Sequence, residues 1–125
     1  MPKSKATQIK WLPDVAEHNY PAAHCYLSIL YDEARVAEVM AKFKSASIVQ
    51  FKAKDIFRAS QLSLLGVSNS HVEKYRQKLL DGKNLSPPLL VRDPQNGKVV
   101  IADGYHRLCA IYGFNEDALV PCKIV

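Results

Sequence analysis

The chain has 125 residues, of which 48% are hydrophobic and 23% are charged. A chain of this length and composition typically forms one domain that buries a core without disulfides, so an intrinsically disordered protein is excluded. Seventeen Lys and Arg residues against twelve Asp and Glu residues give a formal net charge of +5, which favours partners that carry phosphate groups.

The three cysteines, Cys25, Cys109 and Cys122, lie far apart and form no C-x-x-C pair. This spacing argues against a disulfide framework and against a zinc site, and it fits a reducing compartment. No apolar run approaches the roughly 18 to 20 residues that cross a bilayer, and none follows the N-terminal lysines as in a signal peptide. We therefore expect a cytoplasmic protein with no membrane partner.

The N-terminal third of the chain is predicted to be helical. Residues 1–10 are polar and are expected to form a disordered leader, followed by a single domain over residues 11–125. A helix is expected over residues 22–30 behind Pro21, and Asp32 can cap a second helix. The second helix has an apolar stripe made of Val36, Val39, Met40 and Phe43. Residues 11–45 thus form a helical extension to a core over residues 46–125.

The core is predicted to mix strands and helices. Alternating residues over 47–54 indicate a strand with one buried face, and the S-x-x-E sequence from Ser70 to Glu73 indicates a capping box that opens a helix ending at Gly82. Residues 89–92 and 98–102 flank an Asn-Gly turn and indicate a β-hairpin. A short helix over 105–112, stopped by Gly113, and a strand over 118–125 complete the chain. The class is α+β, a small mixed sheet with packed helices around one shared core.

The turn between the hairpin and the short helix carries the candidate chemistry, in the sequence Asp103-Gly104-Tyr105-His106-Arg107. A helix N-terminus has unpaired N–H groups and a partial positive charge, so it attracts anions. Gly104 would let backbone approach a ligand, His106 can donate a hydrogen bond, and the Arg107 guanidinium matches phosphate oxygens in pairs. Asp103 would cap the helix, hold His106 or Arg107, or bind a divalent metal.

The same five residues have a simpler interpretation. Asp-Gly pairs are common in turns, and Asp103 could be an ordinary helix cap while His106 and Arg107 lie on the surface without a ligand. A resemblance favours the first interpretation. Residues 47–125 hold a strand, a helix ending at Gly82, the proline-led strand from Pro87 and a G-x-x-R turn, and in this order they resemble the ParB/sulfiredoxin superfamily.

The resemblance implies a phosphate-binding role for the turn. ParB domains have G-E-R-R at this place and sulfiredoxins have G-C-H-R, so His106 and Arg107 would contact phosphates, with Gly104 and Tyr105 beside them. Tyr105 replaces the sulfiredoxin cysteine, and without that thiolate the reductase reaction cannot run. The free serine kinases of the superfamily have D-G-H-H-R, from which only Tyr105 departs. That version implies that Asp103 lies beside the transferred phosphate in a catalytic or Mg²⁺-binding role, and that His106 has a catalytic role as well.

Further phosphate contacts are implied elsewhere by the resemblance. The start of the earlier helix offers Ser68, Ser70 and Lys74, together with Asn69 and His71, although capping alone also explains Ser70. Arg58 resembles an arginine that follows the first strand of ParB domains. A phosphotransferase also needs a base, for which Asp55, Glu73 and Glu116 are candidates.

Three functions are compatible with these sequence features. The first is a protein that binds a nucleotide with Mg²⁺, acting as an ATPase or small-molecule kinase. The second is a nucleotide-sensing module without catalysis, which could be a homodimer. The third is DNA binding by a helix-turn-helix over residues 62–79, with Gly66 at the turn and Lys74, Arg76 and Lys78 facing a groove. Leu62 is large for the position where two such helices touch, which disfavours the third.

Overall fold

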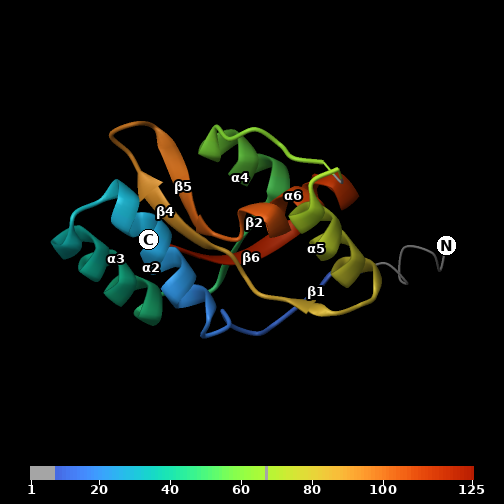
Figure 1. The fold of residues 1–125 in the computed structure, drawn as a ribbon, viewed down its shortest axis with the longest axis horizontal. Coiled ribbons are helices and arrows are strands. Elements are labelled where there is room, and N and C mark those ends of the chain that lie inside the picture. Colours follow the sequence, from blue (N-terminus) through green and yellow to red (C-terminus); the bar gives the residue numbers. More distant parts are fainter. Residues whose placement is uncertain (1–7, 67) are drawn as a thin grey trace.

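The computed structural model describes residues 8–66 and 68–125. Within these residues the chain forms five helices and six strands, shown in Figure 1. In chain order they are β1 (Lys10–Trp11), α2 (Asn19–Leu30), α3 (Glu33–Ser45), β2 (Val49–Lys52), α4 (Ala53–Ser60), α5 (Ser70–Leu80), β3 (Asn84–Leu85), β4 (Leu89–Asp93), β5 (Lys98–Asp103), α6 (Tyr105–Phe114) and β6 (Leu119–Ile124).

The main sheet has four strands in the order β2-β6-β4-β5. β2 pairs with β6 and β4 pairs with β5 in antiparallel fashion, whereas β4 and β6 are parallel. The predicted hairpin is therefore present as β4 and β5, and the last strand is inserted between the hairpin and β2. β1 and β3 form a separate parallel pair. The predicted α+β class with a small mixed sheet is confirmed.

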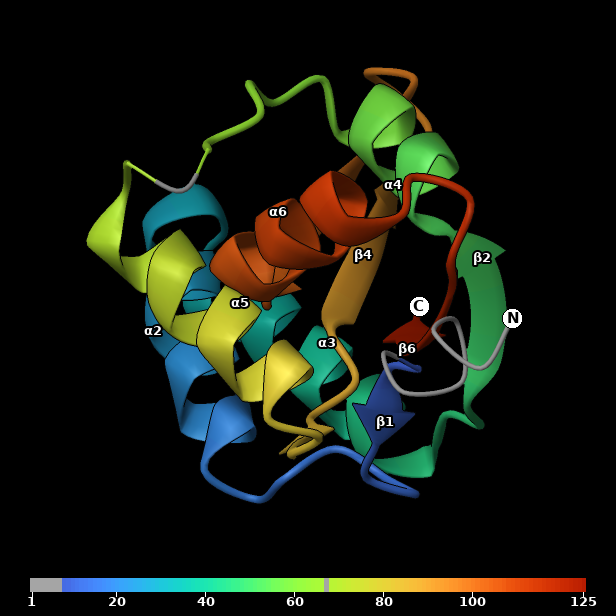
Figure 2. The same cartoon turned by 90° about the vertical axis from the view of Figure 1, so that its right-hand side faces the viewer.

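Helices cover both faces of the sheet. α2 and α3 lie on one side, and α4, α5 and α6 lie on the other (Figures 1 and 2). The sheet residues alternate between the two sides, with Leu90 and Ile101 facing α4–α6 and Leu89 and Val100 facing α2 and α3. The expectation of one shared core is therefore wrong. Two clusters form because both faces of a central sheet are apolar.

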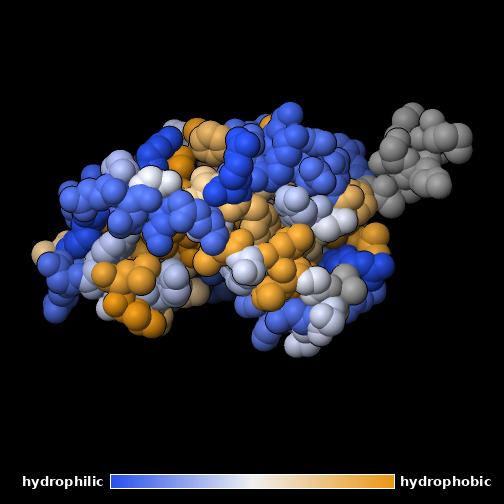
Figure 3. All heavy atoms as spheres, turned by 90° about the horizontal axis from the view of Figure 1, so that it is seen from above, coloured by the Kyte–Doolittle hydropathy of each residue, from blue (hydrophilic) through white to orange (hydrophobic). Residues whose placement is uncertain are grey.

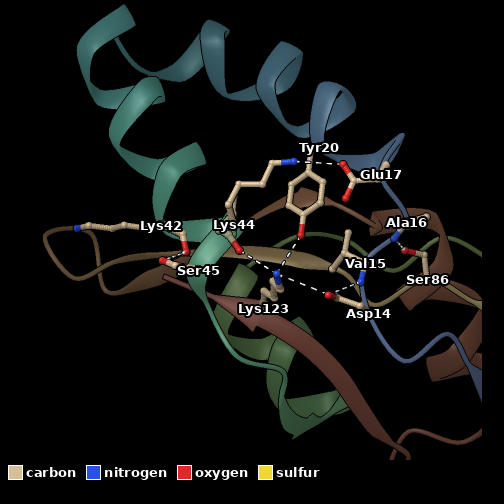
Figure 4. Close-up of polar contacts among 11 residues, drawn as sticks. Asp14, Val15, Ala16, Glu17, Tyr20, Lys42, Lys44, Ser45, Ser86 and Lys123 are labelled. Atoms are coloured by element: carbon tan, nitrogen blue, oxygen red, sulfur yellow. Dashed lines mark hydrogen bonds and ion pairs between the residues drawn. The ribbon is translucent and has the colours of Figure 1, made fainter.

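A buried lysine joins the helical layer to the sheet. Lys123 of β6 is 4% exposed, and its Nζ donates to the Tyr20 hydroxyl (2.9 Å) and to the Phe43 carbonyl oxygen (3.0 Å). The Asp14 carboxylate lies 3.5 Å away. Figure 4 shows these three contacts of Lys123. Burial alone would lower the pKa of Lys123, but the hydrogen bond to Tyr20 and the negative charge of Asp14 outweigh it and raise this pKa. Lys123 is therefore a charged structural contact.

In the helical extension, the structure agrees with the sequence at the Asp32 cap and differs at two places. The Asp32 carboxylate accepts the N–H of Arg35 (2.8 Å) at the start of α3, as predicted. The helix expected from residue 22 already begins at Asn19. The expected leader over residues 1–10 is wrong at its end, because Lys10 pairs with Asn84 in β1; residues 1–7 lie outside the described residues.

In the core, three local predictions are wrong. The strand β2 ends at Lys52 and has no buried residue, because it is the edge strand and its apolar side is only partly covered. Asn69, not Ser70, caps α5, since its side-chain oxygen accepts the N–H groups of His71 and Val72. Gly113 does not stop α6, which continues to Phe114.

No helix within residues 8–66 and 68–125 is long and apolar enough to cross a bilayer.

Candidate functional site

The candidate site lies where β5 ends at Asp103 and α6 begins at Tyr105. Gly104 is the N-cap of α6 and has a φ of 107°, a conformation that residues with a Cβ rarely adopt. A Cβ at this position would lie 2.9 Å from Arg107 Nη2 and 2.9 Å from Pro88 Cβ. Glycine is thus required by packing within the protein. We expected Gly104 to leave room for a ligand, but contacts within the protein explain why this residue is glycine.

Arg107 is the most unusual residue of the turn because it is charged and only 5% exposed. Its Nη2 donates to Asp103 Oδ2 over 2.8 Å, and its guanidinium carbon lies 5.7 Å from the centre of the Tyr75 ring of α5. Its Nε is buried and has no hydrogen-bond partner within residues 8–66 and 68–125. A buried donor without a partner is costly, which sets this Nε apart from most buried polar groups of a folded protein. The interpretation of Arg107 as a surface residue is wrong.

Asp103 performs one of the three roles that the sequence allowed. Its carboxylate pairs with Arg107, and no side chain caps the N-terminus of α6. The carboxylate is therefore a holder of the guanidinium and not a helix cap. Because the cap position is glycine, the first N–H groups of α6 receive no side-chain oxygen, which leaves the positive end of the helix available to an anion.

The N-termini of α5 and α6 meet through two histidines. The rings of His71 and His106 lie 4.9 Å apart at an angle of 38°, and the two helices run side by side (Figure 2). Burial lowers the pKa of His106, and the nearby His71 lowers it further. His106 is therefore neutral at neutral pH, and one ring nitrogen can donate a hydrogen bond while the other accepts one.

Tyr105 makes a hydrogen bond to the backbone of the protein itself. Its hydroxyl donates to the carbonyl oxygen of Ser63 over 2.5 Å, and its ring packs 6.4 Å from that of Phe57. Burial raises the pKa of Tyr105 and also that of the neighbouring Cys109 thiol, so neither residue is ionised at neutral pH. The Tyr105 hydroxyl thus anchors the segment between α4 and α5. Cys109 has the protonated, buried character of a structural cysteine.

The polar residues at the start of α5 lie near this turn. Ser70 is the first residue of α5, and both Ser70 and Lys74 are exposed, as is Ser68 just before the helix. Because Asn69 provides the cap, the Ser70 hydroxyl is not needed for it. The structure therefore brings this group to the same end of the α5–α6 pair as His106. Sequence reasoning missed Tyr75, whose ring lies 5.7 Å from the Arg107 guanidinium carbon, and Pro88, which lies beside Gly104; no motif marks either residue.

Arg58 is not part of this group. It is exposed on α4 and pairs with Asp55 (3.4 Å), and it lines a hollow with Tyr112 and Glu116. Tyr112 and Glu116 lie at the C-terminal end of α6 and beyond it, whereas the Asp103–Arg107 turn is at the N-terminal end.

None of the three candidate bases belongs to the Asp103–Arg107 turn. Asp55 and Glu116 line the same hollow as Arg58. The Glu73 carboxylate accepts hydrogen bonds from Arg76 and Gln77 on the surface of α5. Within residues 8–66 and 68–125, no group of three or more His, Cys, Asp and Glu side chains is arranged to hold a metal ion.

The geometry of a helix-turn-helix is not present over residues 62–79. Residues 62–66 form no helix, and α4 and α5 are separated by residues 61–69 instead of a three- or four-residue turn. α5 packs against α6.

Comparison of the chain with models of protein families, with curated proteins and with solved structures found no match. The resemblance to the ParB/sulfiredoxin superfamily stays a prediction from the sequence, and the site is characterised by its own geometry: a buried arginine with a free Nε at the uncapped N-terminus of α6.

Proposed function

We propose that this protein binds a nucleotide through its phosphate groups at the Asp103–Arg107 turn. One observation carries the proposal: the Arg107 guanidinium is buried, held by Asp103, and has an Nε without a partner beside a helix N-terminus without a side-chain cap. Phosphate oxygens accept hydrogen bonds from guanidinium groups and from helix N-termini, so one phosphate would satisfy both.

Each residue of the turn has a distinct part in this proposal. Arg107 provides the positive charge, and Asp103 fixes the orientation of its guanidinium. His106, neutral and with its ring 4.9 Å from that of His71, donates one hydrogen bond. Ser70 and Lys74 extend the site along α5 toward further phosphates. If Mg²⁺ accompanies the nucleotide, Asp103 would offer it Oδ1, since Oδ2 accepts from Arg107.

The proposal extends to the predictions that rest on the resemblance. We propose a ParB/sulfiredoxin-type fold, a cytoplasmic location and, as the enzymatic form, an ATPase or small-molecule kinase. Nucleotide binding, and not catalysis, is the central claim, because the candidate bases Asp55, Glu73 and Glu116 have partners or neighbours away from the Asp103–Arg107 turn. A protein that binds without turnover would be a nucleotide sensor, the second of the three functions compatible with the sequence.

The test is thermal unfolding with ATP, ADP, CTP and GTP, each with and without Mg²⁺. A ligand at 100 times its Kd stabilises the folded state by about 2.7 kcal/mol. We expect at least one nucleotide to raise the Tm of the wild type and not that of Arg107→Met. Arg35→Met is the control, since Arg35 is exposed on α3, and it should keep the full shift.

A second variant guards against a folding defect in Arg107→Met. His106→Phe keeps an aromatic ring against His71 but has no donor, so it should weaken the shift without unfolding the protein. The proposal is wrong if no nucleotide changes the Tm of the wild type, or if both variants respond as the wild type does. Nucleotide hydrolysis and transfer assays then separate an enzyme from a sensor.

A further inference from the structure

A second hollow lies on the sheet face that α4 only partly covers, away from the Asp103–Arg107 turn. It has a volume of about 440 Å³ and an apolar floor to which all four strands of the main sheet contribute. The floor consists of Phe51 of β2, Ile124 of β6, Leu90 of β4 and Val99 of β5. Pockets for small ligands are typically of this kind, roughly 300 to 1,000 Å³ with a mostly apolar lining.

The walls of the hollow come from α4 and from the β4–β5 turn. Ile56 and Ala59 of α4 form one wall, and Pro94 and Gly97 of the turn form the other. α4 packs beside β5, and Figure 3 views the molecule from the side of α4, where hydrophobic residues are exposed between hydrophilic ones. The hollow is thus open to solvent, while its floor would bury an apolar group.

Arg92 brings a positive charge to this hollow. It lines the hollow, and because it is opposite Val99 in the sheet, the two side chains share a face. Asp93 and Lys98, the next pair in the register, also border the hollow, but their opposite charges offset each other. Among the residues that the structure describes, no carboxylate lies within 4.0 Å of the Arg92 guanidinium.

The carboxylate on the α4 wall is already paired with an arginine side chain. Asp55 of α4 pairs with Arg58 at 3.4 Å. The charge that is left over on this face is therefore the Arg92 guanidinium, at the rim of an apolar floor. A ligand that fits has an apolar body for the floor and a single negative group for Arg92.

We propose that this hollow binds a small monocarboxylate with an apolar body, such as a medium-chain aliphatic acid. The apolar chain lies on the floor between α4 and the hairpin, and the carboxylate accepts hydrogen bonds from Arg92. This site is separate from the nucleotide site and does not depend on it.

The experiment is calorimetric titration of the full chain with decanoate, with decanol and decylamine as probes of the same apolar length. Decanoate should bind in a saturable way, decanol at least tenfold more weakly, and decylamine not at all. Arg92→Met should weaken decanoate at least tenfold, since a charge-assisted hydrogen bond contributes about 1.5 to 3 kcal/mol. Arg35→Met, which removes an exposed arginine of α3, should leave the affinity unchanged.

A second variant tests the hollow itself. Ala59→Trp places a large side chain in it and should abolish binding of both decanoate and decanol. Ala37→Trp is the matched control, at an exposed alanine of α3, and Arg107→Met separates the result from that of the nucleotide site; both should bind decanoate normally. Equal binding of decylamine, unchanged binding in Ala59→Trp, or self-association that Ala59→Trp prevents would overturn the proposal, the last by assigning the hollow to a second copy of the chain.

Discussion

Two buried basic side chains on different parts of the molecule differ in how completely they are satisfied. Lys123 has three donor hydrogens and three acceptors around its Nζ: the Tyr20 hydroxyl, the Phe43 carbonyl and the Asp14 carboxylate. Arg107 is equally buried, yet only its pair with Asp103 is made within the described residues, and its Nε has no partner.

The difference fits a structural role for Lys123 and, in our proposal, a ligand-binding role for Arg107. Burying a charge is costly unless its hydrogen bonds are made, so a protein that buries Lys123 has to surround it with oxygens. At Arg107, the described residues bring the Asp103 carboxylate to Nη2 and the Tyr75 ring to 5.7 Å from the guanidinium carbon, and none of them accepts a hydrogen bond from Nε. Burial alone therefore does not mark a functional cation; our proposal for Arg107 rests on the Nε that finds no partner within the described residues, beside the N-terminus of α6.

Replacing the lysine should have the largest effect on stability. In Lys123→Met, the Tyr20 hydroxyl and the Phe43 carbonyl remain buried without their partner, and we expect a loss of about 2 to 4 kcal/mol in the free energy of unfolding, since each unsatisfied group costs roughly 1 to 3 kcal/mol. Urea unfolding measures this loss. Lys42→Met, at an exposed lysine paired with Glu38, should change almost nothing. A Lys123→Met protein as stable as the wild type would contradict the contrast between the two cations.

Gly104→Ala should have the next largest effect and tests how Arg107 is held. The new Cβ needs a φ near 107° and would press on Arg107 Nη2 and Pro88, so we expect a loss of about 1 to 3 kcal/mol. Gly113→Ala is the control, because Gly113 lies in α6 with no atom within 4 Å of the added Cβ. It should stabilise the protein by about 0.5 to 1 kcal/mol. Similar effects of the two substitutions would show that the turn does not constrain Arg107 in this way.

The smallest effect is a pH dependence from His106. Its pKa in the folded state is lowered from 6.5 by burial and by His71, so the unfolded chain takes up the proton first as the pH falls. The contribution of His106 to the free energy of unfolding should therefore be fully present above pH 6.5 and be lost as the pH drops toward the lowered pKa. Urea midpoints at about pH 7.5 and about pH 5.5 measure the slope.

His106→Asn should reduce this slope, and His24→Asn, at an exposed histidine of α2, should not. The comparison is sharpened by adding the nucleotide that the wild type binds. A bound phosphate favours the protonated ring, so it should weaken or reverse the slope only where Arg107 is present. A slope that is the same in His106→Asn and the wild type would mean that another group titrates.

Local signals in the sequence predicted much of the fold and the strand-to-helix turn of the candidate site. The Asn-Gly turn between two apolar runs specified the β4–β5 hairpin, and Asp32 specified the start of α3, because each feature depends on neighbouring residues only. The Asp103–Arg107 turn was likewise evident from its glycine at a strand-to-helix junction. The pairing of Asp103 with Arg107 was one of several roles that the sequence left open for this carboxylate.

Features that depend on distant residues were not predicted. The alternation of apolar and polar residues in β2 is the same for an edge strand as for a strand whose apolar face is buried. Asn69 and Ser70 are both good helix caps, and the sequence does not show which of them precedes the first residue of α5. The contact between Arg107 and the Tyr75 ring joins α6 to α5, and no sequence pattern connects these two residues. The sequence around Lys123 does not indicate that this lysine contacts Tyr20 and Phe43, which lie in the N-terminal third of the chain.

The central position of β6 has a consequence for synthesis on the ribosome. β2 has β6 as its neighbour in the sheet, through pairs such as Val49 with Cys122, and Lys123 joins the helical layer from the same strand. A nascent chain that has emerged only as far as α6 has the hairpin and the helices but an incomplete sheet. Pairing between such distant residues is slow, and unpaired strand edges make incomplete chains prone to aggregation. Acquisition of the native state thus waits for residues 119–124 to leave the exit tunnel.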